Sequence, residues 1–484
     1  MFDSNARALF ARFDARPFRG LFATFGSLGM RDFIVNWVAQ VESRSLAPFV
    51  VGAVDAASSV AFSALGFPTI SFGSNAMNSS GYFRADERAY LKLAELKMDL
   101  LHGLLSAGWD VLISDADVLW FDSPWPWLGG VGVSSPPVAA KMVLADVLIS
   151  SDAVDLNTDT ETKRWLQDEE LNTGIVFLRS TPSSLALVKL WKARLAIEGA
   201  IPGIYINEQA VFNRMVKGWL AAVPMRLPPS SPAPDADDDA IRGVYHVSSD
   251  IMREAGLNIT MGSLPLLHFA SGHVYFVQLL PQRLGITPCA VHTTFQFGDT
   301  PEFGFGKRQR MRSAGAWHLD NSTYFGHSGP NTPGGRGMNF LALEGGTLEP
   351  LLTDPPFSPA VLSVWAGRDS RGAPGANTGI PLHFVAESVQ RERLRDALAL
   401  ARSLNRALIL PRLSCYCDRH YWLTRACRHP DVPGFSLPIA DCPLDHVHEP
   451  DRWERAGLDF RAAVRVAFSC FGYIFLLSLV TLFD

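Results

Sequence analysis

The sequence has 484 residues, of which 48% are hydrophobic and 19% charged, a balance that excludes a disordered or low-complexity chain. A chain of this length can build two or three domains, because domains usually contain about 100 to 200 residues. The 43 basic and 48 acidic residues give a formal net charge of -5, so no basic field exists to hold a polyanion. We therefore expect no nucleic acid among its partners.

The two ends of the chain differ in apolar content. Residues 1–20 mix charged and apolar side chains, which is the pattern of neither a signal peptide nor a spanning helix. Residues 466–483 are uncharged and just long enough to span a bilayer. We interpret residues 464–483 as a hydrophobic tail that is a buried terminal helix, a membrane anchor or a non-native ending.

Apolar runs and helical spacing alternate from the start of the chain. Residues 48–54 and 66–72 predict buried strands. Between residues 84 and 107 leucines recur at helical spacing without a proline, which predicts a helix with one apolar face. Residues 109–113 then predict a central strand. Strand, helix, strand in this order predicts a parallel sheet with right-handed crossovers, and therefore an α/β domain.

The alternation continues toward the C-terminus. Residues 145–149 and 173–178 predict strands, and residues 183–197 predict a helix. Residues 228–239 are rich in proline and aspartate and predict an exposed insertion. After a Gly/Pro-rich break at residues 326–337, a helix at 392–401 and a strand at 406–411 predict a second, smaller α/β region.

Four of the six cysteines lie between residues 415 and 442. Cys415 and Cys417 are separated by one residue, and neither they nor the histidines after them have the spacing that is usual for zinc ligands. A local disulfide in an oxidising compartment and free buried thiols remain as interpretations. Three N-x-S/T sequons permit a secretory location without establishing it: Asn78, Asn258 and Asn321.

The segment that carries the most chemistry is the pair Asp115 and Asp117, which follows an apolar strand. Open α/β sheets bind ligands at the carboxyl ends of their strands. Two carboxylates suit a hard divalent cation, Mn²⁺ or Mg²⁺, which can neutralise the charge on a departing nucleoside diphosphate. The string Asp235-Ala-Asp237 has the same spacing but lies in the acidic insertion, where a solvated charge run is the better interpretation.

The stretch 108–124 resembles the D-x-D region of the nucleotide-diphospho-sugar transferases of glycosyltransferase family seventy-seven, and within it the plant extensin arabinosyltransferases. The likeness extends from about residue 22 to about residue 450. Further segments resemble successive blocks of the family in order: 31–37, 172–177, 207–213, 271–278, 290–296, 306–312 and 442–447.

This resemblance implies a GT-A fold, a Rossmann-like nucleotide-sugar-binding sheet, over residues 22–325, followed by a C-terminal α/β accessory region at 340–455. It also implies a Mn²⁺- or Mg²⁺-dependent, retaining transfer from a UDP-sugar by a Golgi membrane protein with a luminal catalytic domain. The donor would be UDP-L-arabinofuranose and the acceptor an arabinosylated hydroxyproline of an extensin-like cell-wall glycoprotein. Other Golgi glycosyltransferases are the protein partners it suggests. Unlike the family pattern, we expect no N-terminal anchor in residues 1–20.

The resemblance assigns the metal site. Asp115 and Asp117 match the pair that holds the diphosphate and its metal, and one of the two can act through water or hold the ribose. His292 matches a downstream histidine that completes the metal shell, and a neutral imidazole suits Mn²⁺. His268 and His273 compete for this role, and a core histidine is the alternative for each.

Positive charge for the donor is assigned to Lys307, which would reach the diphosphate, and to Lys97, for which an exposed helix lysine is the alternative. Asp55 would meet the uridine or ribose, or cap a turn. Three arginines near Lys307 would either line the approach or form a solvated basic turn: Arg308, Arg310 and Arg312.

Retention implies a covalent intermediate or a front-face substitution, and the second makes less demand on side chains. Glu208 or Gln209 would lie beneath the anomeric carbon. Asn172 and Thr173 would position sugar hydroxyls. Asp168, Glu169 and Glu170 compete with Glu208 and Gln209 for this role. For all these assignments the alternative is a carboxylate at a helix N-terminus.

Two other functions compete with this one. The same family includes xylosyl- and galactosyltransferases that act on wall polysaccharides. A catalytically silent GT-A scaffold that binds a partner transferase belongs to a different class, and the intact Asp115 and Asp117, with His292 and Lys307, argue against it.

Overall fold

The computed structural model describes most of the chain outside its ends and several loops. The predicted insertion at 228–239, the Gly/Pro-rich stretch at 326–337 and the hydrophobic tail at 464–483 lie outside the described residues. The described residues are 19–46, 48–71, 87–129, 142, 144–154, 156, 170–201, 206–217, 222–226, 240–299, 304–320, 324, 340–342, 379–415, 439 and 441–462.

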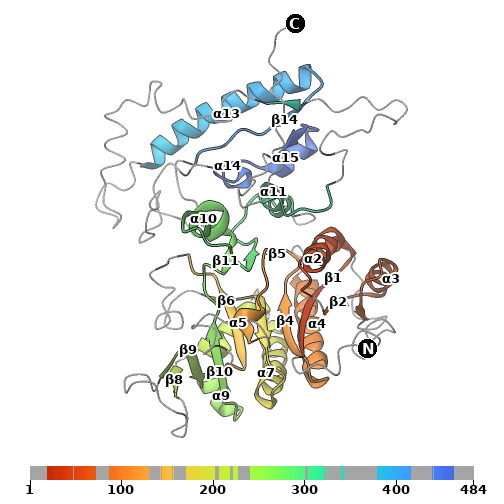
Figure 1. Ribbon diagram of the computed structural model, residues 1–484, viewed down its shortest axis with the longest axis vertical. Helices are drawn as coiled ribbons and strands as arrows, with labels where there is room; N and C mark the ends of the chain where they lie inside the picture. The colour runs from red at the N-terminus through yellow and green to blue at the C-terminus, as the bar shows by residue number, and fades with distance from the viewer. Residues whose placement is uncertain are drawn as a thin grey trace.

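Within these residues a nine-stranded mixed sheet forms the centre of the N-terminal part (Figure 1). Its spatial order is β3 (Thr69–Ser71), β2 (Phe49–Ala53), β1 (Gly20–Gly26), β4 (Asp110–Ser114), β7 (Leu171–Leu178), β6 (Val147–Ser151), β10 (Ile259–Ser263), β9 (Ala240–Val247) and β8 (Ala222–Arg226). Strands β7 and β9 run antiparallel to their neighbours. The amino end of β7 therefore lies at the same edge as the carboxyl ends of β4 and β6.

The predicted α/β class is confirmed, and the predicted strands 48–54 and 109–113 are β2 and β4. The predicted strands 66–72, 145–149 and 173–178 correspond to β3, β6 and β7. The expectation of a parallel sheet is wrong for β7 and β9. A short apolar strand that is buried on both faces has the same side-chain pattern in either direction, so the sequence does not encode its polarity.

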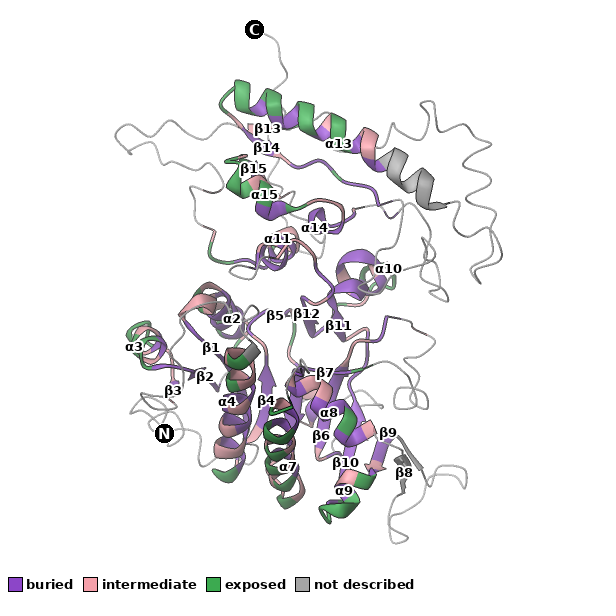
Figure 2. Ribbon diagram, turned by 180° about the vertical axis from the view of Figure 1, so that it is seen from behind, coloured by how far each residue is buried: buried purple, intermediate pink, exposed green. Residues whose placement is uncertain are grey.

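Helices cover both faces of the sheet, and the alternation of side chains along β1 separates two cores. Phe22 packs in one core cluster with α2, while Leu21 and Ala23 pack in the other with α4, α7 and α8. Figure 2 shows α4, α7 and α8 on one face, with their buried sides against the strands. The helices of this N-terminal part are η1 (Leu28–Met30), α2 (Arg31–Ser43), α3 (Ala56–Ala64), α4 (Glu87–Ser106), α5 (Trp125–Leu128), α7 (Pro182–Gly199), α8 (Glu208–Lys217) and α9 (Asp250–Glu254).

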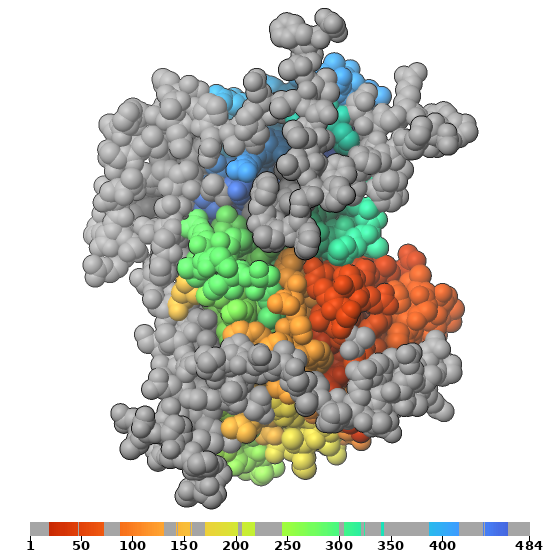
Figure 3. Space-filling model, viewed as in Figure 1, coloured from red at the N-terminus to blue at the C-terminus, as the bar shows by residue number. Residues whose placement is uncertain are grey.

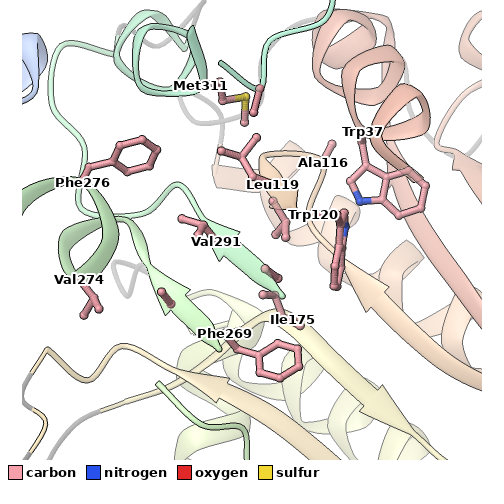
Figure 4. Packing of buried hydrophobic residues seen from close by; sticks show 14 of the residues in the cluster. Trp37, Ala116, Leu119, Trp120, Ile175, Phe269, Val274, Phe276, Val291 and Met311 are labelled. Carbon is pink, nitrogen blue, oxygen red and sulfur yellow. The ribbon is translucent and has the colours of Figure 1, made fainter. Parts of the chain in front are cut away.

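A second sheet joins the D-x-D region to a segment far along the chain. Its order is β11 (Phe269–Ser271), β12 (Ala290–His292) and β5 (Val118–Trp120), with β5 and β12 antiparallel. Figure 4 shows side chains of this region that belong to one hydrophobic core, among them Leu119, Trp120 and Val291. The π-helix η4 (His273–Val277) contacts β11, and α10 (Leu280–Arg283) packs on η4. Helix α11 (Phe305–Ser313) follows later in the chain.

The C-terminal part packs on α11. Strands β13 (Phe340–Leu341), β14 (Ala407–Ile409) and β15 (Phe460–Arg461) pair in parallel, and α13 (Gly379–Ser403) packs on β14. The short helices α14 (Leu444–Val447) and α15 (Pro450–Arg455) contact α11. In the space-filling view the green and teal residues of about 270–320 lie between the orange N-terminal and blue C-terminal parts (Figure 3).

The predicted helix 392–401 lies within the longer α13, and the predicted strand 406–411 contains β14. One core cluster runs from Phe22 to Leu394 and Leu408, so both parts share apolar packing. The division into domains at 22–325 and 340–455 stays a prediction.

Of the cysteine interpretations, a disulfide is confirmed between Cys415 and Cys442, while Cys289 is free and buried. Cys417 and Cys427 lie outside the described residues. Across the described ranges, no helix combines the length and hydropathy that a membrane crossing requires.

Candidate functional site

The D-x-D pair lies in a tight turn between two strands. Strand β4 ends at Ser114, and the amide of Val118, which opens β5, donates to the carbonyl of Asp115 at 3.2 Å. Asp115 is also tied to β7, because its amide donates to the carbonyl of Gly174 at 2.9 Å. The turn buries Asp117 to 5% exposure and leaves Asp115 half-buried at the carboxyl edge of the sheet.

The register of β5 and β12 brings His292 to this pair. His292 faces Val118 across the two strands, and Thr293 donates through its amide and its hydroxyl to the carbonyl of Asp117. His292 Nε2 then lies 3.3 Å from Asp117 Oδ1 and 3.8 Å from Asp115 Oδ2. Ligand atoms of all three residues lie within 4.8 Å of one another.

Asn172 determines which ring nitrogen of His292 faces the carboxylates. Asn172 Oδ1 accepts from the amide of Gly174 at 2.8 Å and lies 3.0 Å from His292 Nδ1. Because this oxygen only accepts, Nδ1 carries the proton and Nε2 presents a lone pair. Asp152 fixes the orientation of the Asn172 amide, because its Oδ1 accepts from Asn172 Nδ2 at 2.8 Å.

The cluster fits a divalent cation. Asp117 Oδ1 is buried and accepts no hydrogen bond from the described residues, although the lone pair of His292 Nε2 lies 3.3 Å away. A cation between these two lone pairs would give both of them a partner in this buried space. The predicted set of Asp115, Asp117 and His292 is brought together here, while His268 packs on Trp127 and His273 contacts Phe295.

Two lysines flank the carboxylates. Lys307, from α11, forms an ion pair with Asp117 Oδ2. Burial alone would raise the pKa of Asp117, but the positive charge of Lys307 opposes burial and helps to hold this pKa well below its usual range. The carboxylate is therefore ionised at neutral pH.

Lys97 is fully buried, so the interpretation as an exposed helix lysine is wrong. Its Nζ lies 3.3 Å from Asp115 Oδ1 and 3.4 Å from Glu208 Oε1, and donates to the carbonyl of Thr173 at 2.9 Å. Burial would lower the pKa of Lys97, but Asp115 and Glu208 outweigh burial and raise it. Lys97 is therefore a charged link between the D-x-D turn and α8.

Glu208 and Gln209 open α8 on the other side of the site. Glu208 Oε1 accepts from the hydroxyl of Thr173 at 3.3 Å, and Gln209 Oε1 accepts from the amide of Thr173 at 3.2 Å. Gln209 Nε2 donates at 3.1 Å to both Asp152 and Glu170. The rivals Asp168 and Glu169 lie outside the described residues.

Asp152 is the residue of this network that the sequence analysis missed. It directly follows β6, as Asp115 follows β4, and both strands end at the same edge. A carboxylate immediately after an apolar strand is the signal that could have found it. Burial raises the pKa of Asp152, although hydrogen bonds from Asn172 and Gln209 oppose the shift.

A pocket of about 100 Å³ opens beside the carboxylates. One wall is polar and contains both aspartates of the turn. The opposite wall is apolar and comes from β1 and α4, so the pocket can hold a molecule with a charged end and a less polar body. Among its lining residues are Asp115, Asp117, Glu208, Lys307, Phe25 and Tyr90.

Other candidates have structural partners. Asp55 caps α3, accepting from the Ser58 amide at 2.7 Å, and is outside the lining of this pocket. Arg308 and Arg310 are buried, so the interpretation as a solvated basic turn is wrong for them. The three arginines of α11 pair with carboxylates: Arg308 with Asp32, Arg310 with Asp445 and Arg312 with Asp320.

Comparison with known proteins gives two curated relatives in Arabidopsis thaliana. The chain is 30% identical over 433 residues to arabinosyltransferase XEG113, covering 89% of this chain and 55% of that protein. It is 25% identical over 165 residues to beta-arabinofuranosyltransferase RAY1, covering 34% of this chain and 28% of that protein. The chain thus spans about half the length, or less, of the curated relatives it matches.

Among solved structures, the galactosyltransferase LgtC in complex with donor and acceptor sugar analogs aligns with a TM-score of 0.34 and 10% identity, covering 63% of this chain and 99% of that one. The apo form of mouse xyloside xylosyltransferase 1 aligns with a TM-score of 0.27 and 12% identity, covering 57% and 97%. The family model of the nucleotide-diphospho-sugar transferases matches residues 44–311. Since this match covers more than half of the chain, including the D-x-D turn and His292, the chain belongs to the nucleotide-diphospho-sugar transferase family.

Proposed function

We propose that this protein transfers a pentose, L-arabinofuranose, from a UDP-sugar to arabinosylated hydroxyproline of extensin-like cell-wall glycoproteins, with retention. The observation that carries the proposal is the cluster of Asp115, Asp117 and His292, whose two carboxylates line a pocket. The similarity to an arabinosyltransferase and a beta-arabinofuranosyltransferase supports the choice of sugar.

Asp115, Asp117 and His292 would hold Mn²⁺ or Mg²⁺. The carboxylates suit either ion, and the imidazole favours Mn²⁺ because nitrogen ligands are less usual for Mg²⁺. When bound, the cation supplies charge neutralisation for the diphosphate of the donor. Asn172 prepares the site by keeping the Nε2 lone pair of His292 turned toward the carboxylates.

Lys307 adds a positive charge that is already in place before the donor binds. It is nearly buried and contacts Asp117, so it can interact with a diphosphate next to the same carboxylate. We also assign Asn172 and Thr173 to donor binding. Thr173 is placed for this role between Lys97 and Glu208.

We assign Glu208 and Gln209 to the space beneath the anomeric carbon. In a front-face substitution the bond from this carbon to UDP breaks while its bond to the acceptor oxygen forms, and the acceptor proton passes to the departing phosphate oxygen. Glu208 already contacts Lys97 and Thr173, so we assign it to stabilise positive charge at the anomeric carbon and not to attack it.

The test is UDP release from UDP-L-arabinofuranose with Mn²⁺ and an arabinosylated hydroxyproline peptide. We expect turnover by the wild type, retention in the product by NMR, and a loss of turnover of at least about 100-fold in Asp117→Asn. The matched control is Asp99→Asn on α4, whose carboxylate pairs with the half-exposed Lys192 and should leave turnover unchanged. Equal release by wild type and Asp117→Asn would remove the role assigned to the carboxylate pair.

The same assay separates the alternatives. Faster release from UDP-xylose or UDP-galactose on a wall polysaccharide would make this a transferase of a different sugar. No release from any donor, with a partner glycosyltransferase retained on an affinity column, would make it a silent scaffold. The argument against the scaffold is that Asp115, Asp117 and Lys307 line one pocket and that His292 lies against both aspartates.

For the cell location we propose a Golgi membrane with a luminal catalytic domain, and association with other Golgi glycosyltransferases. The Cys415–Cys442 disulfide supports an oxidising compartment. Fractionation of the tagged protein with Golgi markers, followed by protease protection of sealed vesicles, tests this. Degradation of the catalytic part in intact vesicles would contradict a luminal position.

A further inference from the structure

A fully buried ion pair joins α11 to the C-terminal part of the chain. Arg310 and Asp445 are 135 residues apart in sequence, and Arg310 Nε lies 2.9 Å from both carboxylate oxygens. Neither side chain exposes any surface. A buried charge needs a partner of opposite sign, so each of the two residues fixes the position of the other.

The same two residues hold the loop that follows His292. Arg310 donates through its terminal nitrogens to the carbonyls of Thr294 at 3.3 Å and Phe295 at 2.9 Å. Asp445 accepts from the amide of Phe297 at 2.9 Å. The strand that ends at His292 therefore continues into a loop whose backbone is hydrogen-bonded both to Arg310 and to Asp445.

The pair also sets the place of Lys307, which lies one turn before Arg310 on α11. The helix is packed directly on the loop, since a Cβ atom on Gly306 would lie 1.9 Å from the carbonyl oxygen of Phe297. Arg310 and Lys307 therefore belong to one helix that is held close to the loop, and Lys307 pairs with Asp117 from this helix. The ion pair thus contacts both the loop that follows His292 and the helix that carries Lys307.

The Asp445 end of the pair is itself anchored. Asp445 lies on α14, three residues after Cys442. Cys442 is bonded to Cys415 and donates its amide to the carbonyl of Leu413 at 2.8 Å. In Figure 1, α11 lies between α14 and the strands that lead to the site. The C-terminal part is outside the segment that the family model matches.

We propose that Asp445 is a positioning residue of the donor site: it holds α11 and the 293–297 loop so that Lys307 and His292 face Asp117. The inference rests on the proposed function for the identity of the ligands. Among the described residues, Asp445 is the carboxylate that pairs with Arg310, while Arg308 and Arg312 are engaged by Asp32 and Asp320. Without Asp445, the guanidinium must move toward water and takes α11 with it.

The test compares wild type with Asp445→Asn, which keeps the shape of the side chain and removes its charge. The control is Asp146→Asn, at the opposite edge of the sheet, whose carboxylate accepts from Thr181 and Thr260. Hydrogen exchange reports on residues 293–297 and 305–313, and titrations with Mn²⁺ alone and with UDP plus Mn²⁺ report on the site. If Asp445→Asn gives no folded protein, Arg310→Lys replaces it, because lysine keeps the charge but loses the fork that binds the loop.

We expect faster exchange in both segments and affinity for Mn²⁺ and UDP that is about 10- to 100-fold weaker in Asp445→Asn, with neither change in Asp146→Asn. Unchanged exchange in the two segments would overturn the inference. So would faster exchange with unchanged affinities. A wild-type chain that binds neither Mn²⁺ nor UDP would overturn the proposed function and the donor-site role together, while the exchange data would still decide whether Asp445 holds α11.

Discussion

Gly174 lies directly against the imidazole of His292. A Cβ atom on Gly174 would lie 2.1 Å from Cε1 and 2.4 Å from Nδ1 of the ring, closer than any real contact. Gly174 also gives its carbonyl to the amide of Asp115 and its amide to the side chain of Asn172. The backbone of β7 thus contacts both Asp115 and His292, and the missing side chain of Gly174 makes room for the histidine.

Gly174→Ala should therefore displace the ring of His292 and abolish tight Mn²⁺ binding. We expect a loss of stability of about 1–3 kcal/mol from overpacking as well. The control is Gly199→Ala at the end of α7, where the new methyl group would meet only the flexible tip of Leu91 at 3.0 Å. Mn²⁺ titration and urea unfolding of both variants check this. Normal Mn²⁺ affinity in Gly174→Ala would contradict the position of His292.

Asn172→Ala separates two roles for this side chain. If Asn172 orients His292, the variant should bind Mn²⁺ about 10- to 100-fold more weakly even without a sugar donor, because the Nδ1 proton loses its acceptor. If Asn172 contacts only sugar hydroxyls, the Mn²⁺ affinity without donor should stay unchanged. Asn36→Ala, at a buried asparagine of α2 that bonds Ala316 and His318, controls for general destabilisation.

Lys97 should contribute far more to the free energy of unfolding than a half-exposed lysine does. Lys97→Met would leave Asp115 and Glu208 without their shared cation, and we expect a loss of about 3–5 kcal/mol in the free energy of unfolding. Lys192→Met removes a half-exposed ion pair with Asp99 and should cost only about 0–1 kcal/mol. Urea unfolding of the two variants measures the difference, and equal losses would contradict the assignment of Lys97 as a buried link.

How far the sequence predicts this site depends on the kind of contact. Asp115 and Asp117 follow an apolar strand, so local pattern is enough to place them at the carboxyl edge of the sheet. His292 and Lys307 needed the resemblance to a family, because their nearness to Asp117 depends on the register of β5 and β12 and on α11. The same local rule would have predicted Asp152, which lies one residue after β6.

Long-range polar pairs mark the limit of such prediction. The local sequence around Arg310 and Asp445 does not predict that these residues form an ion pair. The basic run of α11 resembles a solvated helix turn. The burial of Lys97 is hidden for the same reason, since its partner Glu208 comes from another helix. Asp55 is the reverse case: its cap on α3 is local, and the capping alternative is what the structure shows.

Glu387 predicts a pH dependence of stability in the C-terminal part. Burial raises the pKa of Glu387 to about 7, although the hydrogen bond from Gln390 and the charge of Arg391 oppose the shift. The folded state therefore keeps the proton up to about pH 7, while the unfolded chain releases it near pH 4.5. Stability should fall as pH rises between these values, by about 3 kcal/mol, since one pKa unit corresponds to about 1.4 kcal/mol.

Glu387→Gln removes this ionisation, so the variant should be more stable than wild type at pH 8 and should lose that advantage near pH 4.5. Urea unfolding at the two pH values measures the change, because an isosteric amide resembles the protonated acid. Glu392→Gln makes the same substitution at an exposed position of α13 and should not alter the pH dependence. If Glu387→Gln differs from wild type by the same amount at both pH values, the carboxyl group of Glu387 is not the source of the pH dependence.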